Sequence, residues 1–224
     1  MDNIIQTAST ELARLASSVS EGRHVATGDI RRLSGRLYRQ AGVKDIEGVL
    51  GLCGELLELH DWAAGVIAFD WAYRVKAQYT VDTYHVFYRW LKDYVRGWGD
   101  CDDFCTHALG ELLRQHKELF PDILEWTADG DFWVRRASAV VLIPSVMRND
   151  YEGLEPYAIA GRLLSDTHDL VQKGYGWMLK CLSQVDSAGV EGYLTAHCHD
   201  MPRVAYRYAL EKFDRETRAR LMAL

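Results

Sequence analysis

The chain has 224 residues, 48% of them hydrophobic and 26% charged, a composition that is ordinary for a soluble globular protein. No apolar run reaches the about 18 residues of a membrane span, and the first residues lack the basic start and apolar stretch of a signal peptide. Five cysteines, an odd number without framework spacing, indicate reduced thiols and a cytoplasmic location. The formal net charge of −6 argues mildly against a nucleic-acid partner.

The charge is unevenly distributed along the chain, and this weakens the argument against nucleic acid. Residues 1–130 carry 14 Lys and Arg against 20 Asp and Glu, whereas residues 131–224 carry 12 of each. The last stretch, 202–224, has six basic residues and three acidic ones. The pattern therefore indicates a basic stripe in the second half of a protein that is acidic elsewhere.

Apolar residues recur at helical spacing along almost the whole chain, and no stretch alternates as a strand would. Short loops between amphipathic helices indicate antiparallel neighbours, stacked in pairs with a period of roughly 35–40 residues. The alternative that these features leave open is a compact irregular bundle. Thr80 is the expected N-cap of one helix. We predict helices near 2–20, 27–41, 44–59, 61–78, 80–97, 100–116, 118–128, 131–147, 151–165, 167–185, 187–198 and 202–222.

The first cluster that can carry chemistry is WGDCDDFC at 98–105. If this stretch opens a helix, Trp98 and Asp102 lie four residues apart and share a face, whereas Asp100 and Asp103 rotate away from it. The structural alternative is that Asp100 caps a helix whose first turn favours acidic residues.

The second cluster is FWVRRASAVV at 132–141. Arg135 and Arg136 stand just inside the start of a helix, where their charge opposes the helix dipole. Each arginine therefore needs a partner, either an acid of the previous helix pair or a phosphate. A structural ion pair is the more common outcome.

The third cluster is LVQKGYGWMLK at 170–180. Gly174 and Gly176 inside a helix cost about 1 kcal/mol each relative to alanine. Such glycines permit the close approach of another helix or of a ligand backbone. Lys173 and Trp177 are four residues apart and share a face.

In this order, the three clusters resemble the Trp-x-x-x-Asp, Trp-x-x-Arg and Gln-Lys-x-x-Gly-Trp elements of the AlkD-type DNA alkylation repair glycosylases. Two further segments, 201–212 and 27–33, are similar to the family's C-terminal helix and to an early stretch of it. The resemblance covers roughly 25–222. The chain departs from the family at its start, because the family begins with an aromatic-bearing helix and residues 1–22 contain no Tyr, Phe or Trp.

The resemblance implies an all-α fold, a HEAT-like helical-repeat solenoid (an α-α superhelix) with a concave, basic groove around duplex DNA. We expect one such domain over 1–224, acting as a monomer. The implied activity is removal of cationic N3- or N7-alkylated purines from duplex DNA by cleavage of the N-glycosidic bond, in base excision repair. Neither a metal nor a cofactor is expected, and the lesion base is expected to stay in the duplex while its backbone is held.

The residues on the family's active-site positions suit this reaction. A cationic base leaves readily, so the remaining barrier is an oxocarbenium-like sugar and the delivery of water. A carboxylate can stabilise that charge and orient the water, indole faces can hold a cationic nucleotide, and an arginine can grip a phosphate. The predicted catalytic residues are Asp102 as the carboxylate, Trp98 and Trp177 as the indoles, and Arg136 as the arginine. The predicted DNA-binding residues are Arg135, Lys173, Lys180, Arg203 and Arg207.

Other interpretations of the sequence compete with this one. Residues 197–200, HCHD, have metal-ligand types, but adjacent residues of a helix point in different directions, so no metal is expected there. Cys101 and Cys105, four apart on a helix, are expected to be a buried pair of small apolar thiols, and Trp133 is expected to serve helix packing. Two alternatives in function stay open: a non-catalytic relative that binds damaged or branched DNA, and a HEAT-type protein-interaction scaffold, which the acidic balance suits better.

Overall fold

The computed structural model describes residues 4–19 and 25–224, and over these ranges it contains helices and turns but no strand. The all-α class predicted from the sequence is therefore confirmed. The chain divides into two compact units, which we call unit 1 (ending at Thr83) and unit 2 (Tyr84–Leu224); the single domain expected over 1–224 stays a prediction. Within the described ranges, no helix has both the length and the apolar character needed to cross a bilayer.

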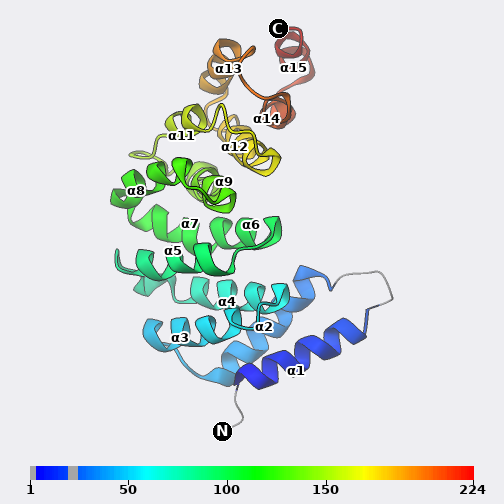
Figure 1. Ribbon diagram of the computed structural model, residues 1–224, viewed down its shortest axis with the longest axis vertical. Helices are drawn as coiled ribbons and strands as arrows, with labels where there is room; N and C mark the ends of the chain where they lie inside the picture. The colour runs from blue at the N-terminus through cyan, green and yellow to red at the C-terminus, as the bar shows by residue number, and fades with distance from the viewer. Residues whose placement is uncertain (1–3, 20–24) are drawn as a thin grey trace. The chain divides into compact units, whose positions relative to one another are not determined.

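Over its described residues, unit 1 contains four α-helices, α1 to α4, that pack on one another (Figure 1). Asp45 and Asp61 cap the starts of α3 and α4 by accepting hydrogen bonds from backbone N–H groups of their first turns. Gly42 ends α2 in the left-handed conformation, with φ 69°. Trp71 is fully buried in the core and donates its indole N–H to the Ser34 carbonyl. The elements are α1 (Ile4–Ser17), α2 (Thr27–Ala41), α3 (Ile46–Leu57), α4 (Trp62–Arg74) and the 3-10 turn η1 (Lys76–Gln78).

Unit 2 contains the remaining helices, and α5 begins at the boundary between the units. In chain order the elements are α5 (Thr83–Tyr94), α6 (Trp98–Thr106), α7 (Ala108–Gln115), η2 (Lys117–Leu119), α8 (Phe120–Glu125), η3 (Trp126–Ala128), α9 (Phe132–Val140), α10 (Ile143–Met147), α11 (Pro156–Arg162), α12 (Asp169–Leu182), α13 (Ser187–Ala196), α14 (Arg203–Ala209), η4 (Leu210–Lys212) and α15 (Arg215–Met222).

Four helices of unit 2 form one layer in which each packs on the next: α6 on α9, α9 on α12, and α12 on α14. The helices α7, α8, α11 and α13 lie on the other side of this layer (Figure 1). The four begin at residues 98, 132, 169 and 203, so successive members start roughly 35 residues apart. This interval agrees with the helix-pair period predicted from the loops. We call α6, α9, α12 and α14 the inner layer.

Several predicted helices are shorter than expected or split in two. The stretch 100–116 breaks at His107, which has φ −120° and ψ −96°, and 118–128 holds only α8 between two 3-10 turns. The stretch 131–147 breaks before α10, where Pro144 lies in the first turn and cannot donate to the preceding helix. Likewise, 151–165 contains a helix only from Pro156.

Two further expectations about helix ends are corrected. The predicted helix at 202–222 divides into α14 and α15, and Asp214 caps the second of these by accepting from two backbone N–H groups. The expected N-cap at Thr80 is wrong, because α5 begins at Thr83 and Thr80 instead donates its backbone N–H to the Thr83 hydroxyl. Residues 2, 3 and 20 of the first predicted helix lie outside the described residues.

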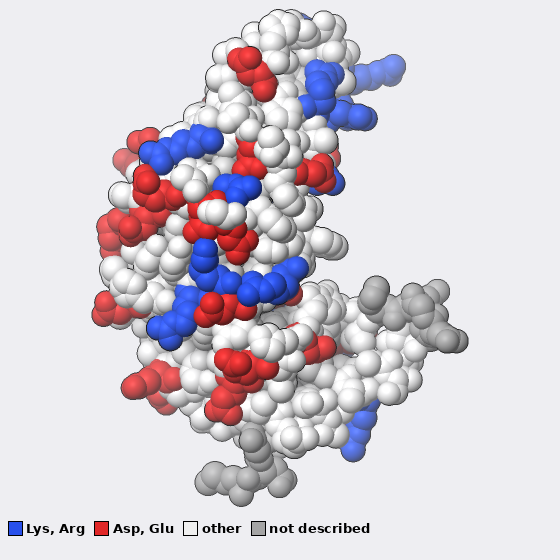
Figure 2. Space-filling model, viewed as in Figure 1, with Lys and Arg blue, Asp and Glu red and all other residues white. Residues whose placement is uncertain are grey.

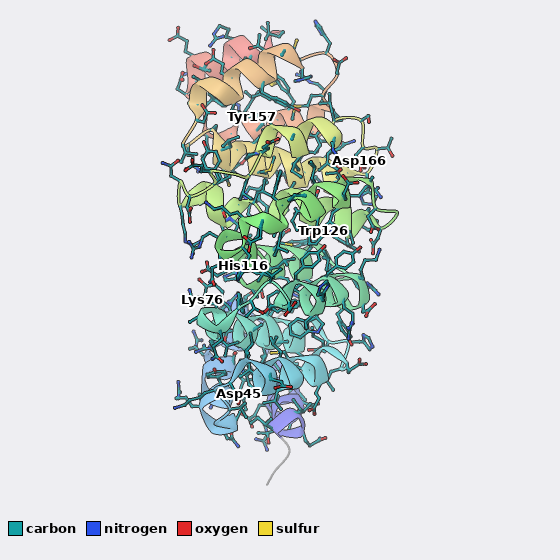
Figure 3. The ribbon with its side chains drawn as sticks, turned by 90° about the vertical axis from the view of Figure 1, so that its left-hand side faces the viewer. Asp45, Lys76, His116, Trp126, Tyr157 and Asp166 are labelled. Carbon is teal, nitrogen blue, oxygen red and sulfur yellow. The ribbon has the colours of Figure 1, made fainter. Side chains whose placement is uncertain are left out.

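Aromatic rings tie α5 to the 3-10 turn η3. Trp126, labelled in Figure 3, is 4% exposed and stacks against Tyr84 and Tyr88, with ring centroids 6.1 and 5.4 Å away. Beside the stack, Lys92 Nζ pairs with Asp129 Oδ1 at 2.9 Å. These contacts hold α5 against η3 and Asp129, and none of the residues involved belongs to the inner layer.

Candidate active site

One open pocket lies in unit 2 along the inner layer, and it gathers residues from all three sequence clusters. It holds about 430 Å³, a volume typical of a small-ligand cleft. Each helix of the inner layer contributes: α6 gives Trp98 and Asp102, α9 gives Arg136, α12 gives Leu170, Lys173, Trp177 and Lys180, and α14 gives Tyr208. The structure thus brings together all four residues predicted to be catalytic.

Asp102 and Arg136, which both line the pocket, form a bidentate ion pair. The Arg136 Nη2 donates to both carboxylate oxygens of Asp102, at 2.7 and 3.0 Å, and Nε donates to Oδ1 at 3.0 Å. Nη1 donates to the Leu170 carbonyl on α12. The Arg136 side chain is 6% exposed and that of Asp102 is 21% exposed. The guanidinium is therefore held inside the protein, and the carboxylate keeps an edge open to the pocket.

The protonation of Asp102 is set by two opposing effects. Burial raises the pKa of this carboxyl above its ordinary value, and the Arg136 charge and hydrogen bonds limit the rise. A carboxylate that is partly desolvated but still ionised by a fixed cation is a strong local source of negative charge. Such a group can stabilise a neighbouring positive charge.

Two indoles stand beside this carboxylate. Trp98 opens α6 and is 65% exposed, which is unusual for so large an apolar side chain. Trp177 is half-buried on α12. Four other tryptophans, at 71, 90, 126 and 133, are buried in the core, as expected for Trp133, which was predicted to serve helix packing. An exposed indole at the rim of a pocket is typical of a surface that binds a ligand.

The two glycines of α12 allow other helices to approach, which was one of the two alternatives left open by the sequence. A Cβ at Gly174 would lie 3.1 Å from Cγ of Arg136. A Cβ at Gly176 would lie 2.7 Å from the Ala205 carbonyl oxygen and 2.9 Å from Cβ of Tyr208. The absence of side chains at these positions therefore places α9 and α14 against α12.

The two lysines of the pocket are both engaged by acids. Lys173 Nζ pairs with Asp169 at 2.6 Å within α12, and Lys180 pairs with Glu211 of η4. All four side chains are at least a fifth exposed. Such solvent-exposed pairs contribute little stability, so an incoming anion can exchange with the acids.

The other predicted DNA-binding arginines lie outside the pocket. Arg135 Nε pairs with Asp166 at 2.6 Å, and Nη1 donates to two backbone carbonyls (Asp166 is labelled in Figure 3). Arg203 and Arg207 are exposed on α14. Basic side chains gather over the α14–α15 end of unit 2, whereas both signs are mixed over α8 and α11 (Figure 2). Contact of these three arginines with DNA stays a prediction.

The remaining acids of the first cluster have structural partners. Asp100 lies in the first turn of α6, and its Oδ2 accepts from the Arg96 backbone N–H at 3.2 Å. Asp103 turns away from the pocket and pairs with His107 at 3.2 Å. Cys101 and Cys105 are both fully buried, as expected of apolar thiols.

The sequence interpretation missed two residues of the pocket, Leu170 and Tyr208. Leu170 stands three residues before Lys173 and seven before Trp177, so helical spacing alone could have placed it on their face. No such signal exists for Tyr208, because Tyr206 and Tyr208 are equally suited to the core. Only the packing of α14 on α12 separates them: Tyr206 is fully buried and Tyr208 is half-buried.

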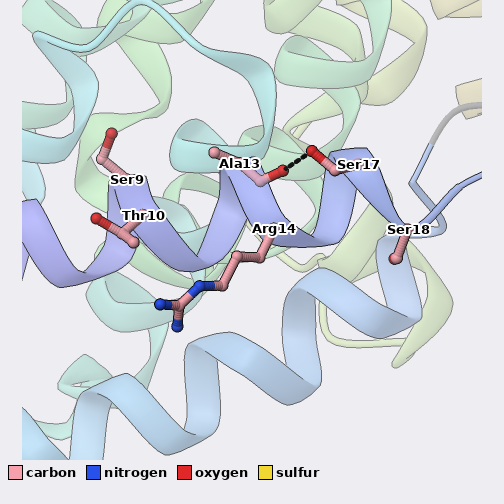
Figure 4. Close-up of a pocket in the computed structure, with 6 residues that line it drawn as sticks. All are labelled: Ser9, Thr10, Ala13, Arg14, Ser17 and Ser18. Atoms are coloured by element: carbon pink, nitrogen blue, oxygen red, sulfur yellow. Dashed lines mark hydrogen bonds between the residues drawn. The ribbon is translucent and has the colours of Figure 1, made fainter.

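Other hollows offer less chemistry. The one along α1 is lined by residues of that helix and by Ser18 after it; the Ser17 hydroxyl donates to the Ala13 carbonyl (Figure 4), and the Thr10 hydroxyl donates to the Gln6 carbonyl. A second one, between α1 and the start of α4, is mostly apolar. Over the described residues, no three His, Cys, Asp or Glu side chains are placed to hold a metal ion.

The chain is similar to known DNA alkylation repair proteins. The model of a family described as DNA alkylation repair enzyme matches residues 7–213. A structure of a predicted DNA alkylation repair enzyme from Enterococcus faecalis is similar, with 16% identity, TM-score 0.68 and coverage of 95% of each chain. AlkD2 from Streptococcus mutans is 18% identical, with TM-score 0.63, and the match covers 92% of this chain and 99% of that one. No curated protein matches the chain. At these identities the likeness concerns the fold, and it confirms the predicted helical-repeat class.

Proposed function

The chain belongs to the DNA alkylation repair enzyme family, and on this premise we propose that it is a DNA glycosylase for cationic N3- or N7-alkylated purines. Its substrate is duplex DNA that carries the alkylated base. Family membership supports a role in DNA alkylation repair. The residues of the pocket support cleavage of the N-glycosidic bond. We further propose that the protein acts as a monomer in the cytoplasm.

One observation carries the proposal: a partly open carboxylate, fixed by a buried arginine, lies in the same pocket as two indoles. Alkylation at N3 or N7 makes the purine cationic, so it leaves without a strong general acid. As the glycosidic bond breaks, positive charge moves to the sugar. Asp102, ionised and unable to rotate freely, stabilises that charge without reorganisation. Its open edge also orients the attacking water.

The aromatic groups and the arginine have supporting roles. The faces of Trp98 and Trp177 attract the cationic nucleotide through cation–π and packing contacts. Arg136 acts as a positioning residue, because its Nε and Nη2 hold the carboxylate and its Nη1 ties the pair to α12. A phosphate contact, as predicted for Arg136 from the sequence, would require some of these donors to exchange partners.

A base-release assay tests the proposal. The protein is incubated with a duplex that contains one N7-methylguanine, and the DNA is then heated in alkali so that abasic sites become strand breaks. We expect breaks at the lesion position only, and none with an unmodified duplex. Lesion binding without breaks would contradict the proposal and match a non-catalytic DNA-binding relative. The absence of any DNA binding would favour a protein-interaction scaffold.

A further inference from the structure

Tyr208 enters the pocket from α14, the helix of the inner layer furthest along the chain from Asp102. Its position is enforced by the contact between α12 and α14. Because Gly176 has no side chain, the Ala205 carbonyl and the Tyr208 Cβ approach α12 more closely than an alanine there would allow. The two helices therefore have one tight register.

A second contact fixes the rotation of α14 about its own axis. Tyr206 is fully buried, and its hydroxyl donates to the Leu221 carbonyl at 3.0 Å. With Tyr206 anchored on one side and Ala205 against Gly176, the Tyr208 ring is directed to the pocket. A side chain held in this way loses little conformational freedom when a ligand binds.

Two lysines line the pocket with Tyr208. Lys173 and Tyr208 line the pocket together, and the hydrogen bond that Lys173 donates to Asp169 raises the pKa of this lysine. Lys180 also lines the pocket. Among the described residues, no group hydrogen-bonds the Tyr208 hydroxyl. The hydroxyl is thus available to donate to a ligand. The two lysines of the pocket can exchange their exposed partners, Asp169 and Glu211, for an incoming anion.

We propose that Tyr208 is a positioning residue whose hydroxyl donates a hydrogen bond to a phosphate oxygen next to the lesion nucleotide. The proposal rests on the proposed function. It adds that the cationic base and the anionic phosphate of the lesion nucleotide occupy different parts of the pocket. A cationic base is repelled by Lys173 and Lys180 and attracted by Asp102, so it occupies the α6 end. The anionic phosphate then lies by the Tyr208 hydroxyl and the two lysines, because tyrosine hydroxyls and lysines are ordinary phosphate partners. Holding the phosphate at one end presents the glycosidic bond to the carboxylate at the other.

The test compares Tyr208→Phe with a matched control, Tyr88→Phe. Both changes delete one phenol hydroxyl from a half-buried ring, but the Tyr88 hydroxyl faces Asp129 outside the pocket. Affinity for an N7-methylguanine duplex is measured at fixed salt, and excision is measured under single-turnover conditions. We expect Tyr208→Phe to weaken lesion-duplex binding roughly tenfold, the loss typical of one hydrogen bond to a charged group. Tyr88→Phe should leave the affinity unchanged.

A change in the DNA then identifies the contact. The two phosphates that flank the lesion are replaced, one at a time, by neutral methylphosphonates. If Tyr208 contacts one of them, that replacement weakens wild-type binding but removes the difference between wild type and Tyr208→Phe. A role of Tyr208 in packing alone would leave the difference in place with both modified duplexes.

The outcomes separate this inference from the proposed function. Equal affinity of wild type and Tyr208→Phe, or a difference that survives both methylphosphonates, would overturn the inference while excision could still proceed. A wild-type protein that binds but does not excise would refute the glycosylase, yet the same methylphosphonate result would still support the phosphate contact. Failure of the wild type to bind the lesion duplex would overturn both.

Discussion

Replacing Asp102 by Asn separates the electrostatic role of the carboxylate from its shape. Asn has nearly the same volume, but it offers a single carbonyl acceptor and would turn an N–H₂ group toward the guanidinium. Excision should fall roughly 100-fold or more, because the charge that stabilises the sugar cation is lost. Affinity for the lesion duplex should change much less, since the loss falls on the transition state.

The same substitution should also destabilise the protein, by an amount that the structure bounds. Asp102 accepts three hydrogen bonds from an arginine that is 6% exposed, and a neutral amide in its place would leave the charge of that arginine largely unpaired. Breaking a fully buried pair costs about 3–5 kcal/mol, and the 21% exposure of Asp102 reduces this to about 2–3 kcal/mol. For a chain of this length the expected fall in Tm is roughly 4–12 °C.

Asp103→Asn is the matched control. Asp103 lies on the same helix, but it pairs with His107 and does not line the pocket. Its replacement should leave the excision rate within about threefold of wild type, since it removes no charge from the reacting centre. Single-turnover rates and thermal unfolding of both variants decide the matter, with rates compared at a temperature where all proteins are folded. Equal losses of rate at the two positions, or an unimpaired Asp102→Asn, would refute the assignment of Asp102.

Three further predictions concern the neighbouring residues. Excision should decline as the pH falls through the raised pKa of Asp102. Arg136→Gln should shift this decline to higher pH, because it removes the charge and the hydrogen bonds that lower that pKa, and Arg136→Lys should shift it less. Coinciding pH–rate profiles of the three proteins would contradict this. In denaturant titrations, Gly176→Ala should lower the free energy of unfolding by about 1–3 kcal/mol, because the added Cβ overlaps with the Ala205 carbonyl. Gly192→Ala is the control: there is open space around Gly192, so the change should be neutral or stabilising by up to about 1 kcal/mol. Arg207→Gln and Arg135→Gln should each reduce the slope of log affinity for DNA against log salt by about 0.9, and Arg135→Gln should also lower stability because it loses its bond to Asp166; an unchanged slope would contradict the contact concerned.

Local spacing was sufficient for much of the fold and for half of the site. Helical periodicity predicted the all-α class and the interval between inner-layer helices, because an amphipathic stripe is a property of neighbouring residues. The same geometry put Trp98 with Asp102, and Lys173 with Trp177, on common faces. Helix ends were less predictable: the helix breaks at His107, although no proline or glycine stands at that position.

The partners of the two adjacent arginines could not be read from the sequence. Arg135 and Arg136 have the same chemistry, and each suits an acid or a phosphate equally well. Adjacent residues of a helix point about 100° apart, so one of them faces Asp166 and the other faces Asp102. Which acid each one meets depends on the rotation of α9 between its neighbours, and those acids are more than 30 residues away in sequence.

The pocket itself is a product of tertiary packing. Gly174 and Gly176 predicted the close approach of either a helix or a ligand. Only the structure shows that helices, α9 and α14, occupy the space beside them. Tyr208 reaches the pocket because Tyr206 is committed to the core by its bond to Leu221. The sequence by itself determined which residues share a helical face, since that depends on fixed local geometry. Which faces meet depends on contacts between residues distant in the chain, and only the folded structure specifies these.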